Sequence, residues 1–189
     1  MKKEYNKKTS DFLILKALKL FIENPYEKIY LREFARKTGI SLNSAQRFLK
    51  IFLKENLIKD SRKANLRFFK ANLDSVVFRQ IKIAFSLKKI EDTELIEKLK
   101  EVSSHLILFG SVAEGLNDSK SDIDLVCIGI NSKKIKEIIS EFQEKINQEV
   151  NCHIFSWGKW KEQTKLNKAF YLDVISKGIS LIGDKPIAE

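Results

Sequence analysis

The stretch that most constrains this chain is residues 106–126, where an apolar segment ends at a glycine and a second one begins with two carboxylates. The first segment stops at Gly110 and Ser111, and the second starts with Asp122 and Asp124. Because side chains alternate between the two faces of a strand, the two aspartates are expected to project from the same face. Glycine lets the intervening turn approach a ligand closely.

The paired carboxylates predict a cation site. Asp122 and Asp124 repel each other unless a cation lies between them. Hard oxygen ligands in this number suit Mg²⁺, which keeps several waters and takes phosphate oxygens as further ligands. A helix starting near Ser111 would direct its free N–H groups at a phosphate. The stretch therefore predicts a phosphate-binding turn beside a metal site.

Length and composition predict a globular protein. The chain has 189 residues, of which 43% are hydrophobic, enough for one sizeable domain or two small ones. No apolar run approaches the roughly 20 residues that span a bilayer, and no apolar signal core follows the basic start, so we expect a cytoplasmic protein without a membrane partner. Cys127 and Cys152 lie in apolar strand-like segments and are expected to be buried free thiols.

Positive charge is concentrated in the first half of the chain. The formal net charge is +10; residues 1–90 hold 22 Lys and Arg against 8 Asp and Glu, a net of +14, whereas residues 91–189 hold 13 against 17, a net of −4. Every arginine precedes residue 80. This distribution favours a polyanionic partner, most simply nucleic acid, over a merely solvated lysine-rich surface.

The first half has the order of a helix-turn-helix followed by a hairpin. Apolar periodicity predicts three helices, at residues 11–22, 31–38 and 41–54. Gly39 is expected in the turn before the third helix and Ser41 as its N-cap. Two short strands are predicted, at residues 57–59 and 66–70. This order resembles a winged helix over about residues 10–72.

The winged-helix resemblance implies DNA binding, with protein docking as the alternative use of such a domain. The third helix is expected to expose residue types that reach base edges or phosphates, namely Asn43, Gln46, Arg47 and Lys50. The basic hairpin turn, residues 61–65, adds Arg62 and Lys63. These six residues are the predicted DNA-binding set.

Residues 73–92 are expected to form a linker helix. Its apolar residues at helical spacing form one predicted inner face, consisting of Val77, Ile81, Ala84 and Phe85. Such a helix fits either a linker packed between two domains or the seam of a homodimer.

The second half alternates between helices and strands. Strands are predicted at residues 105–109, 122–128, 149–155 and 179–182, and helices at residues 93–102, 132–146, 157–161 and 166–177. The pattern formed by Gly110, Ser111, Gly115 and Ser121 with the two aspartates resembles the minimal nucleotidyltransferase domain of the DNA polymerase beta superfamily, over roughly residues 93–184. We therefore expect an α+β fold: a winged helix-turn-helix domain at 1–72, the linker helix, and a small α/β domain with a mixed sheet at 93–189.

The nucleotidyltransferase resemblance implies a reaction. A nucleoside monophosphate would pass from a nucleoside triphosphate such as ATP to an acceptor, with pyrophosphate leaving. Asp122 and Asp124 would hold Mg²⁺, as one ion or two, and serve as the catalytic pair. The implied nucleotide-binding residues are Gly110, Ser111, Lys120 and Ser121. Of these, Ser121 is expected to orient the turn before the aspartates.

Two positions depart from the family pattern. The family usually places a third aspartate on the strand after the long helix, where this chain has Asn151, with Glu149 and His153 on the same face as alternative ligands. An amide oxygen can bind a cation but carries no charge, so we expect weaker metal binding and slower catalysis. Glu114 stands where relatives often carry arginine, and its carboxylate would repel a triphosphate.

Three functions therefore remain open. The chain can be a Mg²⁺-dependent nucleotidyltransferase with a DNA-binding winged helix. It can be a DNA-binding transcriptional regulator with a degenerate nucleotidyltransferase domain. It can also be one half of a two-component system that modifies or masks an all-helical partner protein, as an antitoxin does; this last function is implied by the resemblance alone.

Overall fold

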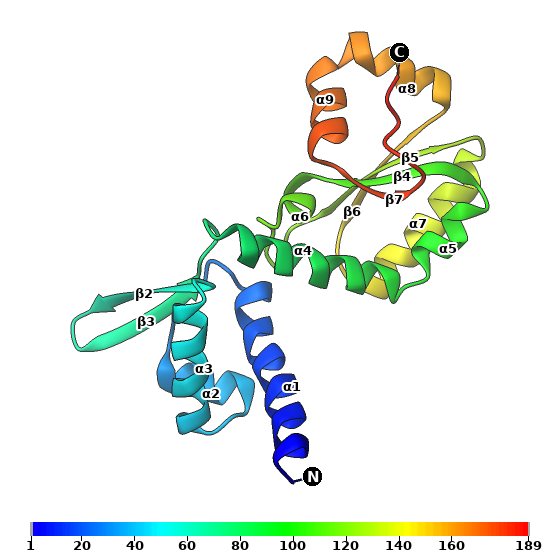
Figure 1. Ribbon diagram of the computed structural model, residues 1–189. Coiled ribbons are helices and arrows are strands. Elements are labelled where there is room, and N and C mark those ends of the chain that lie inside the picture. The colour runs from blue at the N-terminus through cyan, green and yellow to red at the C-terminus, as the bar shows by residue number, and fades with distance from the viewer. Residues whose placement is uncertain (1, 189) are drawn as a thin grey trace. The chain divides into compact units, whose positions relative to one another are not determined.

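The computed structural model describes residues 2–188, with side chains from Leu13 onward. The expected domains, 1–72 and 93–189, begin at Met1 and end at Glu189, and both of these residues lie outside the described part of the chain. The chain divides into two compact units, Met1–Gln80 and Ile81–Glu189. Figure 1 labels the elements of both units.

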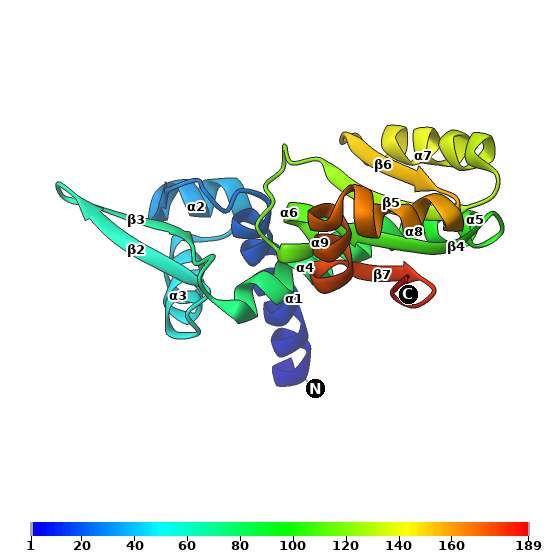
Figure 2. The ribbon, with the colours of Figure 1, turned by 90° about the horizontal axis from the view of Figure 1, so that it is seen from above.

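The N-terminal unit combines three helices with a small antiparallel sheet. In chain order its elements are α1 (Lys2–Glu23), β1 (Ile29–Tyr30), α2 (Leu31–Thr38), α3 (Leu42–Lys54), β2 (Ile58–Lys63) and β3 (Leu66–Ala71). The strand order is β1-β3-β2, and both pairings are antiparallel. In Figures 1 and 2 the β2–β3 hairpin extends well beyond α2 and α3.

Phenylalanines from three helices form the centre of this unit. The ring of Phe21 on α1 stacks on Phe34 of α2 with 5.5 Å between centroids and meets the edge of Phe52 of α3 at 6.3 Å. The hydroxyl of Ser41 accepts the N–H of Ser44, so the predicted N-cap of α3 is confirmed. The buried residues of α3 recur at helical spacing: Ala45, Phe48, Leu49 and Phe52.

Some elements are longer than predicted. Helix α1 begins at Lys2 rather than at residue 11, and β1 was not anticipated. Strand β2 continues through Lys63, because Arg62 pairs with Arg67 and Lys63 pairs with Leu66 across the hairpin. The two basic residues therefore lie on a strand, whereas the sequence assigned them to the turn. Polar side chains are compatible with this strand because every residue after Ile58 is exposed.

Helix α4 (Val76–Glu91) runs across the division between the units. The inner face expected for it is wrong at Val77, which is 60% exposed, and at Ala84, which is also exposed. The buried side contains Phe78 and Lys82 instead. A lysine is compatible with this side because its ammonium group donates to the backbone carbonyl of Asn117 at 2.8 Å.

The C-terminal unit is built on a four-stranded mixed sheet. Its elements after α4 are α5 (Leu95–Lys100), β4 (Ser103–Phe109), α6 (Gly110–Glu114), β5 (Ile123–Gly129), α7 (Ser132–Ile146), β6 (Val150–Phe155), α8 (Trp157–Leu166), α9 (Lys168–Lys177) and β7 (Ile179–Ile182). The strand order is β6-β5-β4-β7. Strands β5 and β6 are parallel, and the other pairings are antiparallel. The predicted mixed sheet and α+β class are thus observed.

Helices cover both faces of this sheet. Figure 1 shows α5 and α7 on one side and α8 and α9 on the other. Alternate residues of β4 and β5 supply the two cores. Leu106, Leu108 and Leu125 pack with Ile135 and Phe142 of α7, while on the other face the buried residues are Ile107, Val126, Ile128, Trp160, Tyr171 and Val174. Strand β5 is therefore apolar on both faces, except at its start.

The described residues contain no helix long and apolar enough to cross a membrane. Cys127 and Cys152 are free thiols, as predicted. Burial raises the pKa of Cys127 to about 11 and that of Cys152 to about 12. Both thiols therefore stay protonated at neutral pH.

Candidate active site of the C-terminal unit

The two aspartates lie at the start of β5, in the middle of the sheet. Asp122 immediately precedes the strand, and Asp124 is its second residue. Asp124 is paired with Phe109, the last residue of β4, and with Asn151 in β6. Residues directly opposite each other in neighbouring strands share a face. Side chains from three strands therefore meet where β4 ends and where β5 and β6 begin.

The turn between β4 and α6 packs directly against one carboxylate. Gly110 has a φ of +69°, a backbone conformation that favours glycine. A Cβ atom at this position would lie 2.4 Å from Oδ2 of Asp124. Glycine is thus required both for the backbone conformation and for the space that the carboxylate fills. The next residue, Ser111, begins the five-residue helix α6 and is half-buried.

Asn151 connects the two carboxylates. Its amide nitrogen Nδ2 donates to Oδ2 of Asp122 at 3.2 Å and to Oδ1 of Asp124 at 3.4 Å. One neutral amide group is therefore placed between two acidic side chains. We refer to Gly110, Asp122, Asp124 and Asn151 as the carboxylate site.

The charge of Asp124 is disfavoured in this position. Burial is the main cause that raises the pKa of its carboxyl, and the nearby charge of Asp122 raises it further. The hydrogen bond from Asn151 and the positive charge of His153 act in the opposite direction. A cation bound at the site would stabilise the ionised form for the same electrostatic reason.

The turn before Asp122 is held by its own hydrogen bonds. The Ser121 hydroxyl donates to Oδ1 of Asp118 at 3.1 Å and accepts the Asp118 N–H at 2.9 Å. The Lys120 N–H also donates to this carboxylate, and it is the main cause that lowers the pKa of Asp118. Ser121 and the backbone of Lys120 thus lie in one turn, while the side chain of Lys120 is exposed. Asp118 was not among the predicted site residues, although an aspartate in a turn commonly bonds the backbone two residues further on.

Glu114 has a cationic neighbour that was not predicted from the sequence. Nζ of Lys177, at the end of α9, lies 3.5 Å from Oε1 of Glu114 and 2.9 Å from Oδ1 of Asp173. The two residues are 63 positions apart, so no local pattern could have predicted the pair. The lysine partly offsets the negative charge that Glu114 brings to the end of α6.

The two alternative ligands have different surroundings. Glu149 is exposed and precedes β6, where its backbone carbonyl accepts the Ile123 N–H at 2.9 Å. His153 lies on β6 with its ring 5.2 Å from that of Phe170. Among the described residues, no group of three or more His, Cys, Asp or Glu side chains is placed to hold a metal ion. In this structure the residue hydrogen-bonded to both aspartates is Asn151.

The predicted DNA-binding residues all lie in the N-terminal unit, on two elements. Those of α3 are exposed: Asn43, Gln46, Arg47 and Lys50. Arg62 and Lys63 are exposed on β2. The guanidinium carbon of Arg47 lies 5.2 Å from the centroid of the Phe48 ring. Both groups of side chains are therefore accessible, the first on the predicted helix and the second on β2 rather than in the predicted turn.

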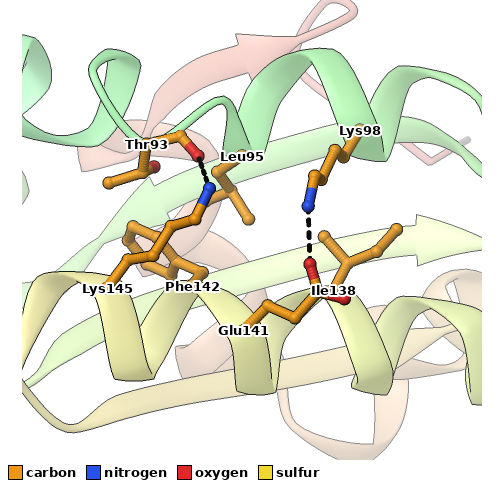
Figure 3. A pocket seen from close by; sticks show the side chains of 7 residues that line it. All are labelled: Thr93, Leu95, Lys98, Ile138, Glu141, Phe142 and Lys145. Atoms are coloured by element: carbon orange, nitrogen blue, oxygen red, sulfur yellow. Dashed lines mark hydrogen bonds and ion pairs between the residues drawn. The ribbon is translucent and has the colours of Figure 1, made fainter.

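A separate small pocket lies between α5 and α7 (Figure 3). It is lined by Thr93, Leu95, Lys98, Ile138, Glu141, Phe142 and Lys145. Lys98 pairs with Glu141 at 2.5 Å, and Lys145 donates to the Thr93 carbonyl at 3.3 Å. The charged groups of this pocket thus have partners within it or beside it, and none of the predicted site residues lines it.

Comparison with known proteins bears on the C-terminal unit. No curated protein matches the chain. One family model matches residues 87–175, and its description is nucleotidyltransferase domain, a name that denotes nucleotidyl transfer in general. The matched range contains all four residues of the carboxylate site. The part of the chain that holds Gly110, Asp122, Asp124 and Asn151 is thus similar to nucleotidyltransferase domains.

Proposed function

We propose that the C-terminal unit binds Mg²⁺ with a nucleoside triphosphate and transfers the nucleoside monophosphate to an acceptor. The observation that carries this proposal is the meeting of Asp122, Asp124 and Asn151 directly beside the Gly110 turn. The match to the nucleotidyltransferase family over residues 87–175 supports the same reaction class.

The donor set of the carboxylate site fits Mg²⁺. Asp122 and Asp124 supply charged oxygens within reach of a single amide group. Rotation of the Asn151 amide by 180° about its terminal torsion exchanges the nitrogen for an oxygen, which can then face a cation. When bound, the metal would supply charge neutralisation for the phosphates and for the leaving pyrophosphate.

Residues of the turn would position the nucleotide. The backbone N–H groups at Gly110 and Ser111 are the proposed triphosphate contacts, because the glycine brings the backbone against the carboxylates. The hydroxyl of Ser121 is engaged with Asp118, so we propose that it orients the turn before the aspartates rather than binding phosphate. The exposed Lys120 side chain is free to swing toward the outer phosphates.

We further propose that the N-terminal unit is a winged helix that binds DNA. Its element order, with three helices and the hairpin β2–β3 in a β1-β3-β2 sheet, supports this assignment. Helix α3 would enter the major groove with Arg47 and Lys50, and the hairpin would contact phosphates through Arg62. Residues 1–80 hold 19 Lys and Arg against 8 Asp and Glu, a net charge of +11, which favours a polyanionic partner.

The enzymatic proposal is tested with α-labelled ATP, CTP, GTP and UTP at millimolar Mg²⁺, with DNA, RNA and the protein itself as acceptors. We expect Asp124→Asn and Asp122→Asn to abolish Mg²⁺-dependent nucleotide binding and transfer. Asp92→Asn removes an exposed carboxylate outside the site and serves as the matched control. If no nucleotide binds to the unchanged protein under these conditions, the proposal is wrong.

Asn151 favours a second candidate, a DNA-binding regulator whose nucleotidyltransferase domain binds nucleotide without turnover. A neutral third ligand weakens metal binding, and a second metal ion would be affected most. This candidate predicts a DNA mobility shift that depends on Arg47 and Lys50 but not on Asp122. Nucleotide would bind and be recovered unchanged. We propose that such a regulator also binds an all-helical protein partner. If no partner co-purifies, the partner proposal is wrong, but the proposal of a DNA-binding regulator is not affected.

A further inference from the structure

Three aromatic rings form a cluster next to the carboxylate site. The rings of Phe109 on β4, His153 on β6 and Phe170 on α9 are mutual neighbours. Their centroids are separated by 6.0 Å for Phe109 and His153, 5.2 Å for His153 and Phe170, and 5.5 Å for Phe109 and Phe170. These distances lie within the range of direct aromatic contact. We call these three residues the aromatic cluster.

The sheet register places this cluster directly beside the aspartates. Phe109 is the partner of Asp124 across the β4–β5 pair. His153 lies two residues beyond Asn151 on β6, so both side chains project from the same face. If the phosphates of a ligand lie at the aspartates, the adjoining part of that ligand is therefore next to the aromatic cluster.

The cluster contains one exposed ring and two half-buried rings. His153 is exposed, whereas Phe109 and Phe170 are half-buried and pack against the apolar core under α8 and α9. Phe170 also contacts the fully buried Trp160, with 6.3 Å between ring centroids. The imidazole ring thus lies at the surface against two rings that pack on the core. Such an arrangement suits stacking with a flat partner.

We propose that the aromatic cluster, through the exposed ring of His153, stacks on the base of the nucleoside triphosphate whose phosphates bind at the carboxylate site. This inference rests on the proposed function and adds the position of the base to it. Stacking on an aromatic ring accepts every base, because all bases have a π face. The site would consequently show little preference among ATP, CTP, GTP and UTP at this contact.

The test distinguishes binding through the base from binding through the phosphates. Dissociation constants for ATP and for inorganic tripolyphosphate are measured by calorimetry at the same Mg²⁺ concentration. We expect His153→Ala to weaken ATP binding about fivefold or more, since loss of one stacking contact has at least this effect. Tripolyphosphate binding should stay unchanged. His153→Phe keeps a flat ring without a charge and should retain the affinity for ATP.

The chain offers a matched control in its other histidine. His105 lies on β4 and stacks on Trp157 with 5.4 Å between centroids, but it is not part of the cluster. His105→Ala should leave both affinities unchanged. Equal weakening of ATP and tripolyphosphate by His153→Ala, or failure of His153→Phe to retain ATP binding, would overturn the stacking proposal in favour of a charge effect. No effect of His153→Ala on either ligand would also overturn it. If neither ligand binds to the unchanged protein, the proposed function itself fails, which is a distinct result.

Discussion

Gly110 and Asp124 occupy adjoining space so tightly that a methyl group on the glycine would lie 2.4 Å from a carboxylate oxygen. The two residues belong to different elements, and the pairing of Phe109 with Asp124 brings the end of β4 beside the start of β5. The turn at Gly110 and the strand that carries Asp124 are thus one structural unit. A side chain at position 110 should therefore displace the carboxylate of Asp124.

Gly110→Ala should reduce both stability and ligand binding. The positive φ alone costs an alanine about 1–2 kcal/mol, and the contact with Asp124 adds to this cost. Gly39→Ala is the matched control, because Gly39 has a φ of +68° but nothing within 4 Å of its Cβ position. Denaturant unfolding should show loss in both variants, with the larger loss in Gly110→Ala. Calorimetry should show weaker Mg²⁺–ATP binding only in Gly110→Ala. Equal behaviour of the two variants would show that the close approach to Asp124 is irrelevant.

Asn151→Asp should strengthen Mg²⁺ binding and weaken the metal-free fold. A third carboxylate adds charge for the cation, but without a cation it repels Asp122 and Asp124 and removes the amide that bridges them. In thermal unfolding, the variant should melt below the unchanged protein in EDTA and show the larger upward shift with Mg²⁺. Glu144→Gln, which changes an exposed residue of α7, serves as the control. An unaltered Mg²⁺ shift in Asn151→Asp would rule out a role for this residue at the metal.

The double substitution Arg62→Ala with Lys63→Ala should weaken DNA binding at every sequence. Both residues are exposed on the hairpin and are proposed to contact phosphates. Each lost phosphate contact lowers the slope of log affinity against log salt by about 1. The measurement is a titration of a mixed-sequence duplex between 50 and 200 mM salt, concentrations over which phosphate contacts dominate the change. Lys133→Ala with Lys136→Ala removes the same charge from exposed positions of α7 and should have little effect. Comparable losses in the two double variants would point to unspecific charge attraction.

Lys82 should make stability depend on alkaline pH. Burial lowers its pKa to about 8, with the charge of Asp118 acting in the opposite direction. Between about pH 8 and the ordinary value near 10.4, the unfolded chain binds a proton that the folded chain does not. The unfolding free energy therefore gains a contribution that rises with pH, by at most about 1.4 kcal/mol per unit.

The comparison with Lys82→Met isolates this contribution. Relative to the variant, the unchanged protein should gain stability as the pH rises from 7.5 to 10 in urea titrations. Lys88→Met is the control, because Asp92 raises the pKa of Lys88 and its titration falls above this window. A constant difference between the unchanged protein and Lys82→Met would contradict the lowered pKa.

Local patterns were sufficient for much of the fold. The helices α3 and α7 were predicted from apolar spacing, because each helix has one side against a core. The same reasoning failed for α4, where Lys82 is buried and Val77 is exposed. Burial of Lys82 depends on a carbonyl partner 35 residues away, so the spacing of apolar residues along the helix cannot predict it.

The sequence by itself determined the parts of the candidate site: a glycine at the end of one strand and two aspartates at the start of the next. Their spacing suffices because the faces of a strand alternate with every residue. Only the tertiary structure decided what surrounds Asp124. Strand register brings Asn151 to both carboxylates, packing brings Phe170 to His153, and the end of α9 brings Lys177 to Glu114. These contacts join residues 17 to 63 positions apart, so they arise from the sheet and its covering helices rather than from any local pattern.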